Sequence, residues 1–401
     1  MKRILLIAPS SYPVNGAEAI VNIKLLRALT KSGNFRIDLV SKKHKWTNYK
    51  SEELSELGIK LHSLNVVEVD NKINLKTIWQ HLLCFLKFGV VFKGSHWAVS
   101  ALPIVKKLLE ENKYDYVLTK DSPSLLLGCY AKRKKNLKWV AKWNDPYPSV
   151  FYPNPYGKGW DYKGTWVDRR LIKIMREFVD VHMFPSQRIL DYMMRYLKLD
   201  PKTTIVSPHV ALSNEQKPLL CDNSKLRIIH SGNLKKPRDP KTFLTALARF
   251  IQSHTDALVE ITILGVFDDE VNHYIKELGL SNYIRIKEPV PYDKSLEELV
   301  NYHVALIVEA NCEEGIFMPT KVSDFVQCGK VIFAISPKQG VLNDLYKSNC
   351  ISYFASVDNV DAIYNELVKL YDDFLGRKSF VQSSIPSSFT EEEIVNQYMS
   401  F

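Results

Sequence analysis

The feature that most constrains the fold is a repeated alternation of short apolar runs and stretches with helical spacing. At the N-terminus, an apolar run over Arg3–Ala8 leads through a turn-rich segment, Pro9–Gly16, into Ala17–Leu29, where apolar residues recur at helical spacing. This order is typical of a βα unit. Strands buried on both faces of a parallel sheet read as continuous apolar runs, so the pattern predicts a parallel sheet covered by helices.

The alternation occurs in two successive series. The first continues with apolar runs at Arg36–Val40, Tyr116–Thr119, Lys138–Ala141 and His182–Pro185. The second begins afresh and comprises Leu226–His230, Val259–Leu264, Tyr283–Ile286, Ala305–Val308 and Val331–Ala334. We therefore expect an α/β protein with two Rossmann-like, doubly wound domains that face a cleft.

A chain of 401 residues is long enough for two such domains. The polar stretch Asn214–Asn223 has no clear period and marks the boundary between them. We place the N-terminal domain at residues 1–215 and the C-terminal domain at residues 216–385. Residues 386–401 carry a capping-box pattern, Thr390–Glu393, before an apolar face, which predicts a helix that packs back on the N-terminal domain.

The composition excludes several classes of protein. Six scattered cysteines without a Cys-X-X-Cys pair encode neither a disulfide framework nor a zinc ribbon, which favours a reducing compartment. The apolar run at the N-terminus is too short for a signal peptide, so we expect a cytoplasmic protein. No cluster of His, Cys and carboxylates at ligand spacing is visible, so we expect no metal or other cofactor.

The formal net charge of +10 is unevenly distributed. Residues 1–220 contain 36 Lys and Arg against 19 Asp and Glu, whereas residues 221–401 contain 18 against 25. A basic half favours an anionic partner, and because nucleic-acid motifs are absent, we expect no nucleic acid but a peripheral contact with the anionic inner face of a membrane.

One stretch bears on that membrane contact. Ile73–Leu102 is strongly apolar but is interrupted by lysines, so it does not span a bilayer. Aromatic residues beside lysines suit an interfacial position. The other interpretation is a pair of core helices in the N-terminal domain, and the sequence leaves both open.

The first string with chemical content is HSGNLKKPRDPKTFLTAL, His230–Leu247. It places a small-residue turn directly after a predicted strand and before a predicted helix. Since Gly232 has no side chain, the backbone can approach a phosphate there, and Lys235, Lys236 or Arg238 can supply the compensating charge. The alternative is a solvated turn with incidental cations.

The second string is EEGIFMPTKVSDFVQCGKVIFAIS, Glu313–Ser336. The backbone amides of Gly315, Ile316 and Phe317 precede a helix that Pro319 helps to start. A helix N-terminus favours an anion, so we expect these amides to face a diphosphate.

Within the predicted helix, Asp324 lies three residues after Lys321, so both side chains can project from one side. The ammonium would then meet phosphate and the carboxylate would meet ribose hydroxyls. The alternative is a capped surface helix with incidental charges. Both strings follow strands of one domain, and open α/β sheets bind ligands at the carboxyl ends of their strands.

The two strings together resemble the donor-binding half of GT-B retaining glycosyltransferases, in particular glycosyltransferase family 4, and the order of the elements extends the resemblance over nearly the whole chain. In that family a glycine turn, an arginine and a lysine hold the donor diphosphate. Gly232 matches the glycine and Arg238 the lysine, whereas Asn233 stands where the arginine is usual. The resemblance therefore gives the diphosphate contact mainly to Arg238, assisted by Lys235 or Lys236.

The family also has two glutamates separated by seven residues, of which the first contacts the donor sugar and the second the ribose. Asp324 resembles the second. Glu314 or Glu313 resembles the first, although Glu314 precedes Asp324 by ten residues instead of eight. Pro319–Lys321 is similar to the Pro-Ser-Lys variant of bacterial members.

The N-terminal half agrees with the resemblance. The loop Pro13–Glu18, with Gly16 at its centre, is similar to the family's glycine loop near the donor phosphate and the acceptor. The residues around Asn144 and Asp145 resemble an Arg-Asp-Pro-Trp element of bacterial sugar transferases, with Asn144 in place of the arginine. Asp145 would orient an acceptor hydroxyl or accept its proton, although an aspartate before proline is also a common turn former.

The resemblance implies a retaining, metal-independent hexosyltransferase of cell-surface polysaccharide biosynthesis. It would move a sugar from a nucleotide-diphosphate donor, held by the C-terminal domain, to a saccharide or lipid-linked acceptor, held by the N-terminal domain. Arg238, Lys321 and the amides near Gly315 would stabilise the departing diphosphate. Two alternatives remain open: a nucleotide-sugar epimerase of the same fold, and a non-catalytic nucleotide-sugar or glycan binding protein.

Overall fold

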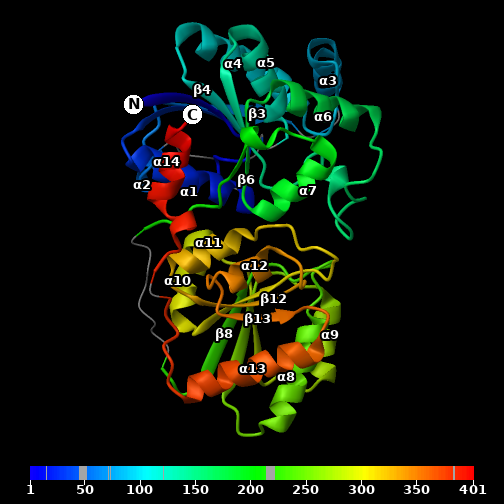
Figure 1. Ribbon diagram of the computed structural model, residues 1–401, viewed down its shortest axis with the longest axis vertical. Coiled ribbons are helices and arrows are strands. Elements are labelled where there is room, and N and C mark those ends of the chain that lie inside the picture. The colour runs from blue at the N-terminus through cyan, green and yellow to red at the C-terminus, as the bar shows by residue number, and fades with distance from the viewer. Residues whose placement is uncertain are drawn as a thin grey trace. The chain divides into compact units, whose positions relative to one another are not determined.

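The computed structural model describes residues 1–14, 16–44, 52–70, 72, 74–120, 122–213, 222–382 and 384–401, which form two compact units (Figure 1). Unit 1 comprises Met1–Tyr152, Gly157–Leu212 and Ser388–Phe401. Unit 2 comprises Pro153–Tyr156 and Ser213–Ser387. Residues 214–221 of the expected boundary stretch lie outside the described residues.

Within the described residues, unit 1 holds a seven-stranded parallel sheet in the order β3-β2-β1-β4-β5-β6-β7. Its central strand is buried on both faces, with Tyr116 and Val117 fully enclosed. The strands are β1 (Lys2–Ile7), β2 (Phe35–His44), β3 (Ser63–Val69), β4 (Tyr116–Lys120), β5 (Lys138–Lys142), β6 (Val181–Phe184) and β7 (Thr204–Val206).

Helices connect these strands and cover the sheet. They are α1 (Ala17–Lys31), α2 (Glu52–Glu56), α3 (Leu75–Phe88), α4 (His96–Glu111), α5 (Ser124–Lys135), α6 (Trp166–Phe178), α7 (Gln187–Leu197) and α14 (Glu391–Met399), with 3-10 turns η1 (Ser149–Phe151), η2 (Pro201–Thr203) and η4 (Ser387–Phe389).

Unit 2 repeats the architecture with a six-stranded parallel sheet, counted over the described residues, in the order β10-β9-β8-β11-β12-β13. Its strands are β8 (Leu226–Ser231), β9 (Val259–Leu264), β10 (Ile284–Lys287), β11 (Val304–Val308), β12 (Val331–Ser336) and β13 (Tyr353–Ser356). Its helices are α8 (Lys241–Ser253), α9 (Asp269–Glu277), α10 (Tyr292–Glu298), α11 (Thr320–Gln327), α12 (Val341–Lys347) and α13 (Val360–Leu375), with the 3-10 turn η3 (Leu299–Asn301).

These two sheets and their helices confirm the expected fold class, an α/β protein with two doubly wound domains. The sequence analysis missed β3, β7 and β13, all of which lie at a sheet edge. Strands β3 and β7 are mostly half-buried, and β7 has only three residues, so neither has the continuous apolar run that marks a central strand. Strand β13 is largely buried, but it has only four residues.

The apolar stretch that the sequence analysis placed at 73–102 forms two unlike helices, and Ile73 itself lies outside the described residues. Helix α4 is core, because Trp97, Ala98 and Ala101 are fully buried. Helix α3 packs on α4 through a narrow side around Cys84 and exposes most of its apolar residues. No helix in the part of the chain that the structure describes is long and apolar enough to cross a bilayer.

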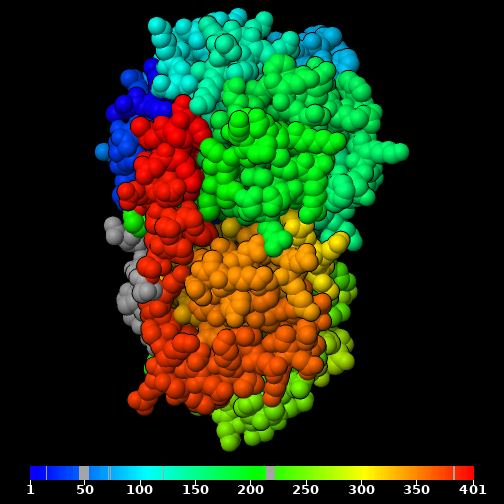
Figure 2. All heavy atoms as spheres, viewed as in Figure 1, coloured from blue at the N-terminus to red at the C-terminus, as the bar shows by residue number. Residues whose placement is uncertain are grey.

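The C-terminal helix α14 returns to unit 1 and packs beside α1, as expected (Figures 1 and 2). The Thr390 side chain caps it by accepting a hydrogen bond from the Glu393 amide at 3.3 Å. Ile394 and Tyr398 are fully buried in the core of unit 1, and the Tyr116 hydroxyl donates to the Tyr398 carbonyl at 3.1 Å. The buried side chains of α14 therefore belong to the same hydrophobic core as those of β1 and α1.

We expect Ile394→Ala to destabilise unit 1 by about 2–5 kcal/mol, because the truncation removes buried methylene groups and leaves a cavity. All seven tryptophans of the chain lie between residues 46 and 166, so the urea dependence of tryptophan fluorescence reports on the N-terminal half. The control is Asn396→Ala on the exposed side of α14, which should stay within about 0.5 kcal/mol. Equal midpoints for the two variants would contradict this role of α14.

Candidate functional site

In unit 2, the loop after β8 and the start of α11 meet at one point. Gly232 follows β8 with a φ of +134°, a conformation that L side chains rarely adopt. A Cβ at this position would lie 1.8 Å from Nζ of Lys321, which is on the first turn of α11. Only glycine therefore allows the Lys321 ammonium to lie against the backbone after β8.

The loop after β9 supports this arrangement. The Gly232 amide donates to the Leu264 carbonyl at 2.7 Å, and a Cβ on Gly265 would lie 2.4 Å from the Gly232 carbonyl oxygen. The Asn233 side chain accepts a hydrogen bond from the Val266 amide at 3.4 Å. In this structure Asn233 thus braces two neighbouring loops at the carboxyl ends of β8 and β9.

Electrostatics distinguish Lys321 from a surface lysine. Burial, and then the positive charge of Arg238, lower the pKa of Lys321 to about 8, although Glu309 and Asp324 act in the opposite direction. The ammonium is therefore held close to a second cation in a poorly solvated place. An anion bound there would favour the charged form of Lys321.

Arg238 is balanced by a carboxylate that the sequence analysis did not identify. Its Nε lies 3.4 Å from Oε2 of Glu309, which directly follows β11. The attraction of Glu309 raises the pKa of Arg238, while burial raises the pKa of Glu309 itself. The one available signal was a glutamate placed immediately after the fully buried run of β11.

The other cations of the first string lie outside this cluster. Lys235 and Lys236 are exposed, and Nζ of Lys236 pairs with Glu270 at 3.1 Å. Behind the cluster, His230 is buried, and its Nδ1 lies 3.1 Å from the Leu306 carbonyl oxygen. Burial, and then Lys321, lower its pKa well below the usual range, so His230 is neutral.

Asp324 lies one turn after Lys321 on α11 and is buried. The Tyr292 hydroxyl donates to its Oδ1 at 2.7 Å. Burial, and then the charge of Asp324, raise the pKa of Tyr292. One carboxylate oxygen is thus held by a neutral phenol, which fixes the orientation of the carboxylate.

The expectation that the amides before α11 face a diphosphate is wrong for two of them. The Gly315 amide donates to the Gln339 carbonyl at 2.8 Å, and the Ile316 amide lies 3.1 Å from the Glu314 carbonyl oxygen. Gly315 is instead packed against Gly340, in a strand-like bridge. The ring of Phe317 contacts Tyr156 edge-on, with 5.1 Å between ring centres. A backbone amide within a bridge is already paired and cannot serve a ligand as well.

The two glutamates that compete for the donor sugar have different surroundings. Glu313 is exposed and lines a hollow of about 500 Å³ at the carboxyl ends of β11 to β13, together with Lys338, Gln339 and Asp358. Glu314 is half-buried, does not line this hollow, and its backbone carbonyl accepts a hydrogen bond from Cys312 Sγ at 3.4 Å.

In unit 1, a cavity of about 750 Å³ opens at the carboxyl ends of β1, β2, β4 and β5. Gly16 precedes α1 with a φ of +91° and has open space around its Cα. On α1, Oε1 of Glu18 accepts a hydrogen bond from Nδ2 of Asn144 at 2.5 Å. Asp145 is exposed and faces the same cavity, which places it with Glu18 and Asn144 in one site.

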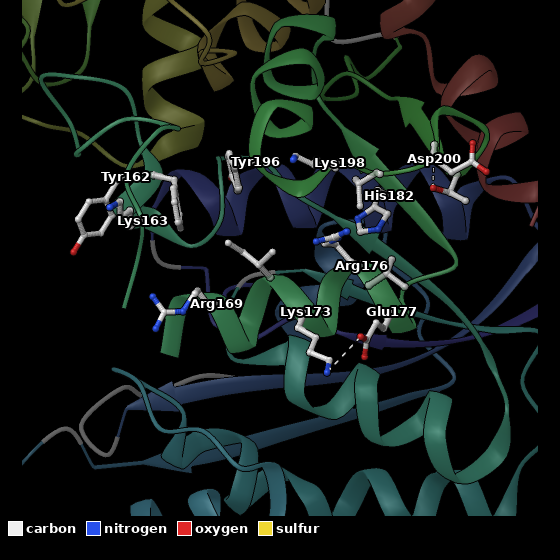
Figure 3. A pocket seen from close by; sticks show the side chains of 15 residues that line it. Tyr162, Lys163, Arg169, Lys173, Arg176, Glu177, His182, Tyr196, Lys198 and Asp200 are labelled. Atoms are coloured by element: carbon white, nitrogen blue, oxygen red, sulfur yellow. Dashed lines mark hydrogen bonds and ion pairs between the residues drawn. The ribbon is translucent and has the colours of Figure 1, made fainter. Parts of the chain in front are cut away.

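A second hollow in unit 1, of about 700 Å³, lies beside α6 and α7 (Figure 3). Its floor includes His182, whose pKa burial lowers to about 3 and whose Nδ1 accepts from Trp143 Nε1 at 3.0 Å. Cations line its rim: Lys163, Arg169, Lys173, Arg176 and Lys198. It lies near the starts of β6 and β7, away from the strand ends at which open α/β sheets bind ligands.

Among the described residues, no group of three or more His, Cys, Asp or Glu is arranged to hold a metal ion. The metal independence and the absence of a cofactor stay predictions.

The sequence matches no protein-family model and no curated protein. Its structure is similar to HepE from Anabaena in complex with UDP and glucose, at 14% identity and a TM-score of 0.67 over 100% of this chain and 99% of that one. It is also similar to sucrose-phosphate synthase from Thermosynechococcus elongatus, at 12% identity and a TM-score of 0.68 over 100% and 98%. A third similar structure is the apo form of the lipopolysaccharide outer core galactosyltransferase WaaB, at 13% identity and a TM-score of 0.61 over 99% of both chains. The chain therefore has the GT-B fold.

We expect the Lys321 amine to titrate at a pKa of about 8. Arg238→Gln should raise this pKa because it removes a neighbouring positive charge, and Glu309→Gln should lower it because it removes a negative one. Only the neutral amine reacts with acetic anhydride, so the pH dependence of acetylation, followed by mass spectrometry, measures the pKa. The exposed Lys236 serves as internal control. Unchanged titration of Lys321 in both variants would contradict the charge cluster.

Proposed function

We propose that the chain is a glycosyltransferase that moves a sugar from a nucleotide-diphosphate donor to a saccharide or lipid-linked acceptor in cell-surface polysaccharide biosynthesis. The observation that carries the proposal is the contact between Gly232 and Lys321, with Arg238 and Glu309 beside it. The contact places the Lys321 ammonium, whose pKa is lowered, against the backbone of Gly232 at the carboxyl end of β8. Parallel α/β sheets bind nucleotides at the carboxyl ends of their strands.

A diphosphate suits this cluster for electrostatic reasons. Lys321 and Arg238 repel each other in a poorly solvated place, and Glu309 compensates only in part. A departing diphosphate gains negative charge as the bond to the sugar breaks. Two preorganised cations stabilise that charge more strongly in a buried site than in water. In this scheme Lys321 and Arg238 contact the leaving group, and Glu309 positions Arg238.

The other donor contacts follow the same order along the chain. Asp324, oriented by Tyr292, accepts hydrogen bonds from the ribose hydroxyls. Glu313 is the stronger candidate for the donor sugar, because it is exposed beside a hollow at the strand ends. Asn233, which occupies the place of the family's arginine, braces a loop and leaves the charge to Lys321 and Arg238.

We assign the acceptor to the cavity of unit 1. Asp145 and Glu18 line it, and Asp145 accepts a hydrogen bond from the hydroxyl of the half-buried Tyr152, whose pKa is raised by partial burial and then by Asp145. Carboxylates at this place can orient a sugar hydroxyl and accept its proton. Retention of configuration, hexosyl transfer and membership of glycosyltransferase family 4 are part of the proposal and rest on the motif resemblance.

We expect Arg238→Ala and Lys321→Ala each to weaken UDP binding about ten- to a hundredfold, since losing a charged hydrogen bond costs roughly 1.5–3 kcal/mol. UDP is the probe because HepE was solved with it. The measurement is calorimetry on the full chain in EDTA, which also tests metal independence. The matched control is Lys236→Ala, an exposed cation of the same loop. Wild-type affinity in both test variants would remove this donor site, and binding that needs a divalent ion would overturn the metal-free scheme.

Product analysis separates transfer from the two alternatives. The protein is incubated with labelled UDP-sugars and a lipid-linked oligosaccharide pool, and the products are resolved by chromatography. Label in the oligosaccharide supports transfer. A changed sugar still attached to UDP identifies an epimerase, and an unchanged donor that nevertheless binds identifies a binding protein.

We further propose that the protein acts at the cytoplasmic face of a membrane, to which α3 binds peripherally. Six large apolar side chains of α3 are 46–86% exposed and follow one another at helical spacing: Leu75, Ile78, Trp79, Leu82, Phe85 and Leu86. Exposed lysines flank this apolar face, at Lys76 and Lys87. A helix with exposed aromatic residues beside lysines suits the interface of an anionic bilayer.

Cations of a neighbouring helix extend this surface. The C-cap of α3, Gly89, lies next to Arg170 of α6, since a Cβ there would be 3.8 Å from the guanidinium (Figure 1). Helix α6 exposes Arg169, Lys173 and Arg176, which line the hollow of Figure 3. Each cation near an anionic surface contributes about 1 kcal/mol of binding energy.

We expect the full chain to sediment with vesicles that contain anionic lipid at low salt, and to be released at high salt as the charges are screened. The double variant Trp79→Ser, Phe85→Ser should lose most of this binding without a lower unfolding temperature, because both side chains are about half exposed. Leu258→Ser, which alters a similarly exposed residue of unit 2, is the control. A wild-type protein that ignores anionic vesicles at low salt would refute the membrane contact.

A further inference from the structure

The cavity of unit 1 has two chemically different walls. One carries carboxylate and amide groups, Glu18, Asn144 and Asp145, together with the Tyr152 hydroxyl and the buried Lys142. The other carries only basic side chains: Lys42, His44, His81, Lys93 and His96. The acceptor role proposed above uses the first wall and leaves the second unexplained.

The basic wall is assembled from three separate elements. Lys42 and His44 lie at the end of β2, His81 lies in α3, and Lys93 and His96 lie before and at the start of α4. Three of the ten histidines of the chain thus line one cavity. Because the elements are distant in sequence, this gathering is a property of the fold and not of local composition.

His96 is the most informative member of this wall. His96 is only 8% exposed. Neither nitrogen of its imidazole ring makes a hydrogen bond of ordinary geometry. The His81 ring stands edge-on to it, with 5.2 Å between ring centres. Burial, and then His81 and Lys42, lower the pKa of His96, while the backbone and carboxylate of Asp70 act in the opposite direction. A buried imidazole whose hydrogen bonds are poorly formed is costly, and a ligand oxygen in the cavity could accept a hydrogen bond from it.

The kind of acceptor follows from the charges. Lys42 and Lys93 supply positive charge, and imidazoles supply N–H donors, which together suit the oxygens of a phosphate. A metal ion is not the better occupant, since no metal-binding group is found among the described residues. Glu18 and Asp145, which line the same cavity, would repel a phosphate and instead suit sugar hydroxyls.

We propose that this cavity binds a glycosyl phosphate, with the phosphate against Lys42, His81, Lys93 and His96 and the sugar against Glu18 and Asp145. The inference rests on the proposed function, because it names the acceptor of that reaction as a sugar that carries a phosphate. The cavity of about 750 Å³ is within the usual range for a ligand of this size. The same phosphate chemistry can come from a soluble sugar phosphate or from a lipid-linked one.

The position of His81 favours the lipid-linked form. Helix α3 turns His81 toward the cavity and exposes Trp79 and Leu82, its close neighbours in sequence, to solvent. One helix thus joins the phosphate wall to the apolar face described above. A phosphate bound at His81 would lie close to a surface that suits a hydrocarbon chain.

The test uses the full chain, saturated with UDP so that the donor site of unit 2 is occupied. Glucose 1-phosphate and glucose are titrated separately, and binding is followed by calorimetry and by NMR of the histidine ring protons, with His81→Gln and His96→Gln used only to assign signals. We expect glucose 1-phosphate to bind at least ten times more tightly than glucose and to shift the His81 and His96 signals.

Charge variants locate the phosphate. Lys93→Gln, at an exposed position where folding is not at risk, should weaken glucose 1-phosphate about tenfold or more and leave glucose binding unchanged. Lys107→Gln, an exposed lysine on α4 that pairs with Glu111, is the matched control and should change neither. Equal affinity of the two sugars, or unmoved His81 and His96 signals, would overturn the inference.

Neutral phosphatidylcholine vesicles with and without a polyprenyl phosphate distinguish the two sources of phosphate. Capture only by the phosphate-bearing vesicles, weakened by Lys93→Gln, assigns a lipid-linked ligand. Binding of glucose 1-phosphate without such capture assigns a soluble one. UDP affinity is measured in the same samples: normal UDP binding without a phosphate response refutes this inference alone, whereas loss of UDP binding refutes the donor site.

Discussion

The candidate site of unit 2 depends on one contact, that of the Lys321 ammonium with the bare backbone of Gly232. The contact joins the loop after β8 to the start of α11, and the Gly265 loop supports it from the β9 side. It also affects the charge of the site, because burial beside Arg238 lowers the pKa of Lys321 to about 8, so the amine is mostly protonated at neutral pH and loses its proton just above it. Glu309 pairs with Arg238 and so offsets part of the repulsion between Arg238 and Lys321. The cluster therefore keeps its positive charge at a smaller cost in stability.

The candidate sites of the two units are formed in the same way, although their side chains suit different ligands. In each, parallel strands bring loops that are distant in sequence to a common edge, and side chains on those loops form the site. Unit 2 gathers two cations around a glycine, which suits a compact diphosphate. Unit 1 contains a larger cavity that is lined by basic side chains and by carboxylates. This lining suits a ligand with an anionic end and a neutral end. The sheets therefore explain where the sites lie, and the loops explain what they bind.

The fold class followed from the sequence because buried parallel strands leave continuous apolar runs, and the misses included half-buried edge strands such as β3 and β7, which lack them. The types and order of Gly232, Arg238 and Lys321 led to the prediction of phosphate chemistry; the structure brings the three residues together, and their role stays a prediction. Glu309 was missed because its role arises from a contact with Arg238, 71 residues away, which no local pattern encodes. The Gly315 amide was misassigned for the same reason, since its partner, the Gln339 carbonyl, is supplied by a distant loop.

Helix α3 illustrates how one element can serve two surfaces. An ordinary surface helix buries its apolar stripe and exposes its charges. Helix α3 departs from this pattern over Leu75–Leu86: most of its apolar residues are exposed, as its lysines are, while Thr77 and Cys84 are buried. Exposing six large apolar side chains to water is unfavourable, so such a face is expected to be covered by a partner. In the proposed membrane contact, a bilayer would cover it without requiring a second protein, and the exposed cations of α6 would supply the matching charge. Because His81 lies between the exposed and buried sides, a membrane-bound α3 would bring the phosphate wall of the cavity close to the lipid from which a phosphate-linked acceptor comes.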